Sequence, residues 1–229
     1  MCPLMNMNQK NSSWVEVYAE KIKLDGSLKY VDRKAKEKSA LIENIINNTP
    51  KEGRILEAGC GTAAISIYLG NLGYNVTALD VEPDMLELAR DISKNFERKP
   101  NFVVGDIRYL KFARNSFDTS FSNGVLEHFS DEEIRRSIEA QTVCCRRVIF
   151  SVPSKFFREN EKIYGDERFL TKEKWRELIE ESNARVISEF EFSYKETNHF
   201  KNLYLFSRSI LGCIKPYIGF VVKNKRISL

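Results

Sequence analysis

The 229 residues of the chain include 36 Lys and Arg and 32 Asp and Glu, a formal net charge of +4 at pH 7. The length suits one domain of about 50–250 residues, and a composition of 42% hydrophobic and 30% charged residues is typical of globular proteins. So small a charge argues against nucleic-acid binding. Five cysteines without a CxxC pair, beside two histidines, predict no metal site.

The sequence shows no targeting feature. Residues 1–10 contain no apolar core of a secretory signal, and no segment reaches the roughly 18 apolar residues of a membrane-spanning helix. An odd number of cysteines without a disulfide framework suits a reducing compartment. We therefore expect a cytoplasmic protein.

The predicted elements begin with a disordered tail over residues 1–13 and a helical cap over 14–49, broken at Asp25-Gly26. From residue 50 to 153, short apolar strands alternate with helices. Strands are expected at 54–58, 75–79, 102–105, 117–122 and 148–152, and helices at 62–72, 82–96 and 131–142. This alternation predicts an α/β domain with a parallel, doubly wound sheet.

After residue 153 the pattern changes. A long loop, then a helix over 171–182, then strands at 185–192 and 200–206 predict an antiparallel hairpin at the edge of a seven-stranded sheet. The predicted domain, 14–207, comprises the helical cap 14–49, a cofactor-binding core 50–153, and a substrate loop with the edge hairpin over 154–207. Residues 208–229 are predicted to be a separate basic and apolar segment.

A glycine-rich turn follows the first predicted strand, in the run Glu57-Ala58-Gly59-Cys60-Gly61-Thr62-Ala63-Ala64. Gly59 permits the tight turn, Gly61 lets a ligand touch the backbone, and Ala64 lets helix and strand pack closely. Parallel sheets bind ligands beyond the carboxyl ends of their strands, where this turn lies.

Two acids end the next two predicted strands. Asp80 follows the strand 75–79 at a spacing that suits a carboxylate on ribose hydroxyls, and Asp106 follows the strand 102–105. Each could instead cap a helix or a loop, because Asp favours such positions. Their occurrence on consecutive strand ends beside the glycine turn favours a binding site.

Together these segments resemble class I S-adenosylmethionine-dependent methyltransferases of the small-molecule group, which includes the ubiquinone-biosynthesis-like and type 11 enzymes. The resemblance rests on Glu57-x-Gly59-x-Gly61, on Asp80 to Leu86, on Gly105-Asp106-Ile107 and on Phe117 to Phe129. It implies a Rossmann-like fold, S-adenosylmethionine as cofactor, S-adenosylhomocysteine as product and no metal. The implied reaction is an in-line displacement that moves a methyl group to an O, N, C or S atom of a small-molecule acceptor.

The resemblance also implies residue roles. Glu57 would face the methionine amino group, and a carboxylate there would repel the pyrophosphate of a nicotinamide dinucleotide. Asp80 would accept from both ribose hydroxyls. The remaining implied cofactor contacts are Gly59 and Gly61 on the methionine portion, Val81, Met85, Asp106 and Ile107 around the adenine, and Asn123 in the methyl-donor pocket. Val81 and Met85 could equally be plain core.

The candidate catalytic residue is His128, because it is the only histidine near the predicted site and imidazole can deprotonate a hydroxyl or thiol. Glu127 is a similar candidate that could instead orient the loop, and His128 could simply pack there. A base is needed only where the acceptor keeps its proton. The candidate substrate residues are Tyr18, Tyr30, Phe156, Tyr164 and Arg168, each of which could instead pack on the core as part of a lid.

Three functional hypotheses follow. The leading one is an enzyme that methylates a small molecule, and the alternatives are a non-catalytic cofactor- or partner-binding protein and an RNA or protein methyltransferase. The segment Ser122 to Val125 lacks the Pro-Pro signature used for planar amino nitrogens, which lowers the macromolecular alternative. The basic stretch 204–229 could lie on an anionic membrane, pack on the domain or form a dimer contact, so a monomer or homodimer is expected.

Overall fold

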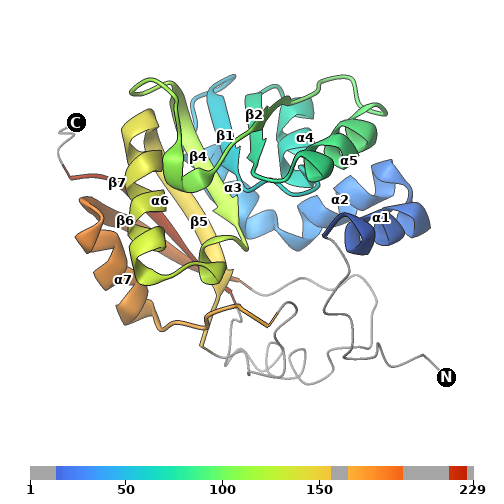
Figure 1. The fold of residues 1–229 in the computed structure, drawn as a ribbon. Helices are drawn as coiled ribbons and strands as arrows, with labels where there is room; N and C mark the ends of the chain where they lie inside the picture. The colour runs from blue at the N-terminus through green and yellow to red at the C-terminus, as the bar shows by residue number, and fades with distance from the viewer. Residues whose placement is uncertain (1–13, 156–164, 193–216, 226–229) are drawn as a thin grey trace.

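The computed structural model describes residues 14–155, 165–192 and 217–225, and helices cover both faces of one sheet (Figure 1). Within these segments seven strands lie in the order β3-β2-β1-β4-β5-β7-β6. They are β1 Arg54–Ala58, β2 Asn75–Asp80, β3 Asn101–Val104, β4 Phe117–Asn123, β5 Cys145–Pro153, β6 Ala184–Phe192 and β7 Tyr217–Asn224. The first five strands are parallel, and β7 is antiparallel to both β5 and β6. The predicted mostly parallel, doubly wound sheet with an antiparallel edge is confirmed.

The described helices are α1 Trp14–Asp25, α2 Ser27–Glu37, α3 Ser39–Asn47, α4 Ala64–Asn71, α5 Pro83–Ser93, α6 Asp131–Cys144 and α7 Lys172–Glu181, with 3-10 turns η1 Ile107–Tyr109 and η2 Leu126–His128. Successive strand side chains point to opposite faces of a sheet. On β5, Val148 and Phe150 therefore pack with α6 and α7, while Ile149 packs on the other face with α3 and α4. Because both faces are covered, the central strands β1, β4 and β5 are buried along most of their length.

The N-terminal helices α1 and α2 pack on α4 and α5 beside the carboxyl edge of the sheet (Figure 1). Tyr30 and Val31 of α2 are buried against Ala64 and Ile67 of α4. The break between α1 and α2 lies at Gly26, with a φ of 73°, as the Asp25-Gly26 pair predicted. This packing brings α2 within reach of the ligand-binding edge of the sheet.

Helix starts follow the local sequence signals. Ser130 and Glu133 form both hydrogen bonds of a capping box at the start of α6. Thr171 caps α7 by accepting a hydrogen bond from the N–H of Lys174. Pro83 lies in the first turn of α5, where the lack of an N–H costs nothing.

The antiparallel part of the sheet differs from the sequence-based expectation. The strand that pairs with β6 is β7, over Tyr217–Asn224, and it lies between β5 and β6. The predicted partner, 200–206, lies outside the described residues. Residues 217–224, which were assigned to a separate C-terminal segment, therefore belong to the sheet. Their run Ile218 to Val222 is buried throughout, so it shows no strand periodicity by which to identify it.

A close packing contact on β7 generates the first prediction. A Cβ added at Gly219 would lie 2.1 to 2.6 Å from three ring atoms of Phe190 on β6. Gly219→Ala should therefore lower the free energy of unfolding by roughly 1–3 kcal/mol, as overpacking does. Denaturant titration followed by circular dichroism measures this change.

Gly70 is the matched control for this substitution. It lies inside α4, where an added Cβ would meet its nearest neighbour, Arg98 O, at an ordinary 3.6 Å. Gly70→Ala should raise the free energy of unfolding by about 0.5–1 kcal/mol, because Ala is the better helix former. Equal effects of the two substitutions would contradict the packing account.

Candidate active site

A cavity of about 520 Å³ lies at the carboxyl ends of the parallel strands. The sequence-predicted residues that line it are Tyr18, Tyr30, Glu57, Gly59, Gly61, Asp80, Val81, Met85, Asp106, Ile107, Asn123 and His128. Phe156 and Tyr164 lie outside the described residues. The structure thus brings the predicted cofactor positions together on one cavity.

The glycine turn after β1 is held to β2 by main-chain hydrogen bonds. The N–H groups of Gly59 and Cys60 both donate to the carbonyl oxygen of Leu79, at 2.8 and 2.9 Å. The φ of Gly59 is 80° and that of Gly61 is 51°, in the region that side chains disfavour. A Cβ at Gly59 would lie 2.6 Å from Val125 Cγ2, whereas one at Gly61 would meet Met85 Cε at 3.7 Å. Gly59 therefore permits close packing, and Gly61 exposes its backbone to the cavity.

Asp80 joins the end of β2 to this turn. Its Oδ2 accepts a hydrogen bond from the N–H of Gly61 at 2.7 Å, and its Oδ1 accepts one from the N–H of Glu82 at 3.1 Å. The α5 helix that follows has Glu82 as its N-cap residue. Asp80 thus restrains both the chain before α5 and the glycine turn, with its carboxylate in the cavity wall.

Glu57 is a buried acid beneath the same turn, with 4% of its surface exposed. Its Oε2 accepts hydrogen bonds from the N–H and the hydroxyl of Ser66, at 3.2 and 2.5 Å. Burial raises the pKa of Glu57 to about 8, against the lowering effect of the Ser66 hydrogen bonds. A cation placed beside this carboxyl group would favour its ionised form.

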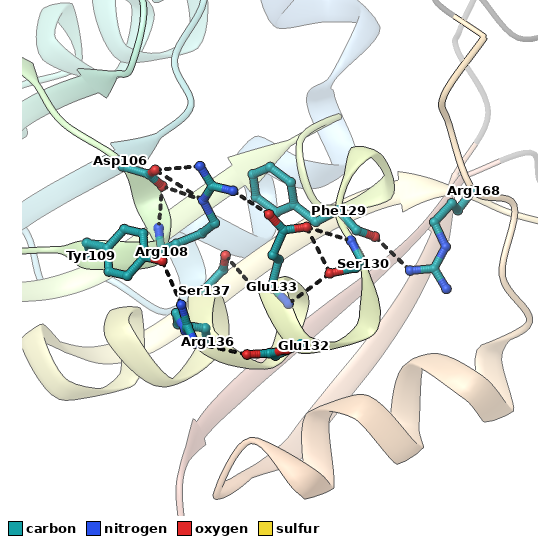
Figure 2. Close-up of polar contacts among 10 residues, drawn as sticks. All are labelled: Asp106, Arg108, Tyr109, Phe129, Ser130, Glu132, Glu133, Arg136, Ser137 and Arg168. Carbon is teal, nitrogen blue, oxygen red and sulfur yellow. Dashed lines mark hydrogen bonds and ion pairs between the residues drawn. The ribbon is translucent and has the colours of Figure 1, made fainter.

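Asp106 lies at the far side of the cavity and pairs with Arg108. Its carboxylate accepts hydrogen bonds from the N–H of Arg108 at 2.8 Å and from the guanidinium at 2.7 Å. These hydrogen bonds lower the pKa of Asp106. Figure 2 shows the guanidinium between Asp106 and Glu133, and it lies 5.3 Å from the ring centroid of Phe129. A ligand amino group that reached Asp106 would share its carboxylate with Arg108.

Arg168 holds the segment 165–170 against the start of α6. Its guanidinium donates to the carbonyl oxygen of Phe129 and to Asp131 Oδ1, both at 2.6 Å (Figure 2 shows the first of these bonds). Its main-chain N–H donates to the carbonyl oxygen of Glu127 at 2.9 Å. The structure thus places this predicted substrate residue in a loop contact, whereas its neighbours Asp166, Glu167 and Phe169 line the cavity.

The other predicted residues have defined partners at the cavity wall. His128 Nδ1 lies 2.8 Å from Asp166 Oδ1. Asn123 Oδ1, at the end of β4, accepts a hydrogen bond from the Ser151 hydroxyl at 2.9 Å. The hydroxyl oxygens of Tyr30 and Thr62 lie 3.2 Å apart. These contacts hold side chains from separate elements in the wall of the cavity.

Sequence reasoning missed Lys38 and Tyr217, which also line the cavity. Lys38 follows α2 in a charged run typical of a solvated surface, yet only 5% of it is exposed. Tyr217 begins β7. The apolar run that follows it could have indicated a buried strand, but no local signal marks Lys38.

Residues 14–155, 165–192 and 217–225 contain no group of three or more His, Cys, Asp or Glu that could hold a metal ion. In the same segments no helix is both long and apolar enough to cross a membrane.

Comparison with known families matches residues 55–146 to a methyltransferase domain. An uncharacterised methyltransferase of Bacillus subtilis is 39% identical over 72 residues, 31% of either chain. A malonyl-[acyl-carrier protein] O-methyltransferase of Pectobacterium atrosepticum is 39% identical over 70 residues, 31% of this chain and 26% of the relative. The ubiquinone biosynthesis O-methyltransferase of Methylocella silvestris is 36% identical over 83 residues, 36% of this chain and 32% of the relative. The matches span about a third or less of these relatives.

Solved structures share the fold over most of the chain. One match is a chain from the complex between the Haloferax volcanii Trm112 methyltransferase activator and a methyltransferase. The match covers 93% of this chain and 98% of that chain, with a TM-score of 0.70 and 14% identity. Magnesium protoporphyrin IX methyltransferase from Synechocystis, with bound S-adenosylhomocysteine, matches 86% of this chain and 85% of its own, with a TM-score of 0.62 and 15% identity. At such identities the likeness shows the fold alone.

The strand order, the glycine turn after β1 and the acids at the ends of β2 and β3 define the class I methyltransferase fold. Residues 55–146 match a methyltransferase domain, and this part of the chain is similar in sequence to S-adenosylmethionine-dependent enzymes. The resemblance seen in the sequence is therefore confirmed.

The two glycines of the turn should respond differently to the same substitution. Gly59→Ala combines a positive φ with a clash against Val125, so it should cost roughly 2–4 kcal/mol of unfolding free energy. Gly61→Ala should cost only the backbone strain, about 1–2 kcal/mol. Denaturant titration of both variants measures the difference.

A second substitution tests the cause of this difference. Val125→Ala removes the methyl groups nearest to Gly59. Introduced beside Gly59→Ala, it should recover part of the lost stability, and beside Gly61→Ala it should not. Recovery of the same size in both backgrounds would show that Val125 is not the obstacle.

Proposed function

We propose that this chain transfers the methyl group of S-adenosylmethionine to a small-molecule acceptor. The observation that supports it is the convergence of Glu57, Gly61 and Asp80 on one cavity from the ends of two adjacent strands. Acids suit a zwitterionic sulfonium cofactor with an ammonium group and a ribose diol. They do not suit the pyrophosphate of a dinucleotide.

The cavity residues fit the parts of this cofactor. Gly61 offers open backbone, and the Asp80 carboxylate is within reach of any hydroxyl held against that turn. Val81 is 56% exposed beside Asp80 and lines the cavity, so it offers an apolar surface for a planar base. The bound cofactor supplies an electrophilic methyl group and leaves as a neutral thioether. The protein has to align the acceptor with this methyl group, which can contribute several kcal/mol.

Oxygen is the acceptor atom that the relatives support. Two of the relatives are named as O-methyltransferases, one of malonyl-[acyl-carrier protein] and one of ubiquinone biosynthesis. The alternative of a non-catalytic binding protein predicts the same cofactor binding without methyl transfer. Product formation with acceptor candidates therefore separates the two.

Cofactor binding is the test of this proposal. Isothermal titration of wild-type protein with S-adenosylmethionine and S-adenosylhomocysteine should give dissociation constants on the order of micromolar. Asp80→Ala should weaken both by roughly tenfold or more, because hydrogen bonds to a charged group are lost. A thermal melt of the variant checks that it folds.

The control is an acid of the same type on α5. Asp91 is exposed and pairs with Lys94 on the surface, so Asp91→Ala should leave both dissociation constants unchanged. Failure of folded wild-type protein to bind either compound would overturn the proposed function.

Protonation of Glu57 should make cofactor binding dependent on pH. Its pKa of about 8 means that the carboxyl group is protonated in the free protein at neutral pH, whereas pairing with the cofactor ammonium requires the carboxylate. Affinity should therefore rise as pH rises toward 8, by up to roughly tenfold per unit. Binding should release a proton below pH 8, measurable by calorimetry in buffers of different ionisation enthalpy.

Glu57→Gln is the control for this linkage. It keeps a hydrogen-bond acceptor for Ser66 but cannot titrate. The variant should bind more weakly near pH 8 and show no proton release. An unchanged pH slope in this variant would assign the linkage to another group.

A further inference from the structure

Part of the cavity wall lies outside the expected cofactor contacts, and we call this part the inner end. Its wall comprises Tyr30, Lys38, Glu127, His128, Phe169 and Tyr217. These residues come from the N-terminal helices, from η2, from the segment 165–170 and from β7. None of these six residues is among the expected cofactor contacts, so this part of the wall is available to an acceptor.

Glu127 has a buried carboxylate that accepts a main-chain hydrogen bond but leaves one oxygen without a partner among the described residues. Its main chain anchors the loop, since its carbonyl oxygen accepts the N–H of Arg168. Its side chain is only 4% exposed, and Oε2 has no hydrogen-bond partner among the described residues. Oε1 lies 3.4 Å from the position that a Cβ would take at Gly124. A buried carboxyl group without a full set of partners costs folding free energy, which is expected where the group serves a ligand.

Lys38 places a cation at the same inner end. Only 5% of the residue is exposed, and its Nζ lies 4.6 Å from the ring centroid of Tyr217 and 5.5 Å from that of Phe192. Such contacts hold an ammonium group against aromatic faces. The α2–α3 junction that carries Lys38 is fixed by a hydrogen bond from its N–H to Lys34 O. The cation therefore has a defined position.

Glu127 and Lys38 affect each other's pKa, and other charged side chains nearby affect both. Burial raises the pKa of Glu127 to about 7; His128 and Lys38 lower it, and Glu167 raises it. Burial also lowers the pKa of Lys38 to about 7; Lys34 lowers it further, and Glu127 and Glu37 raise it. A carboxylate and an ammonium are thus both available near neutral pH, which suits transfer of a proton.

This pair discriminates among acceptor types. A charged acceptor suits only one member of this pair, because an ammonium is attracted by Glu127 but repelled by Lys38, and the reverse holds for a carboxylate. A neutral hydroxyl suits both, since it can donate to Glu127 while Lys38 stabilises the charge that develops on its oxygen. An aliphatic hydroxyl is a much weaker acid than a phenol, so its pKa lies further from the value of about 7 for Glu127. A phenolic hydroxyl, with a pKa of about 10 as in tyrosine, is close enough, and an adjacent ammonium stabilises its anion. The aromatic walls from Tyr30, Phe169 and Tyr217 suit a planar ring.

We propose that the inner end of the cavity is an acceptor subsite for a phenolic hydroxyl, with Glu127 as the base and Lys38 as a positioning cation. This inference rests on the proposed function. The O–H bond of the phenol breaks and its proton passes to the Glu127 carboxylate. The phenolic oxygen forms a bond to the methyl carbon as the carbon–sulfur bond breaks, and that electron pair stays on sulfur.

The test compares phenol with its methyl ether, anisole, which lacks the proton that Glu127 would accept. Binding of each to protein saturated with S-adenosylhomocysteine is followed by NMR titration. At pH 7, phenol should bind about tenfold more tightly than anisole. The preference should fall in acid as Glu127 is protonated and in alkali as Lys38 loses its proton, giving a bell-shaped profile.

Three variants assign the two limbs of this profile. Glu127→Gln should reduce the preference to below about threefold at every pH. Lys38→Met should remove the alkaline limb and move the acidic limb to higher pH, because Lys38 lowers the pKa of Glu127. Glu167→Gln, the matched control in the same cavity, should keep the preference and move the acidic limb to lower pH.

Either of two results would overturn the subsite. One is equal binding of phenol and anisole by the wild type, a comparison that stands even if Glu127→Gln fails to fold. The other is a folded Glu127→Gln variant that keeps the preference. Failure of the wild type to bind S-adenosylhomocysteine is a separate outcome, because it contradicts the proposed function itself.

Discussion

The carbonyl oxygen of Leu79 is the contact on which the site depends. It accepts hydrogen bonds from both Gly59 and Cys60, so the first turn of the domain cannot move independently of β2. The next residue, Asp80, adds a side-chain bond to the N–H of Gly61. The end of β2 thus fixes the glycine turn that follows β1, through the Leu79 carbonyl oxygen and the Asp80 carboxylate. The open backbone and the carboxylate are consequently positioned before any ligand arrives.

Most of the fold, and the meeting of the glycine turn with the strand-end acids at one cavity, could be predicted because their determinants are local. The capping box at Ser130, the proline at residue 83 and the glycine turn each act over a few residues. Parallel strands add a simple rule, since their carboxyl ends meet at one edge. Acids found there, such as Asp80, are expected to converge.

The inner end was predicted only in part. Tyr30, Glu127 and His128 were candidates from the sequence, whereas Lys38 and Tyr217 reach the cavity only through tertiary packing. Lys38 lies in a run of charges that has the pattern of a surface, yet rings from β6 and β7 cover it. Tyr217 belongs to a strand without an alternating pattern, since both of its faces are buried. Asp106 was predicted to be an acceptor for a ligand, whereas Arg108 already engages its carboxylate (Figure 2). Spacing along the chain carries no information about such partners.

The place of β7 between β5 and β6 has a consequence for how the sheet is completed. β6 precedes β7 in the chain but pairs only with it among the described strands. During synthesis β6 therefore has no neighbour in the sheet until residues 217–224 have been made, and β5 keeps an open edge. Unpaired edges of this kind are prone to intermolecular pairing. A chain that lacks residues 217–224 should thus be more prone to aggregate, although its glycine turn after β1 would already be in place.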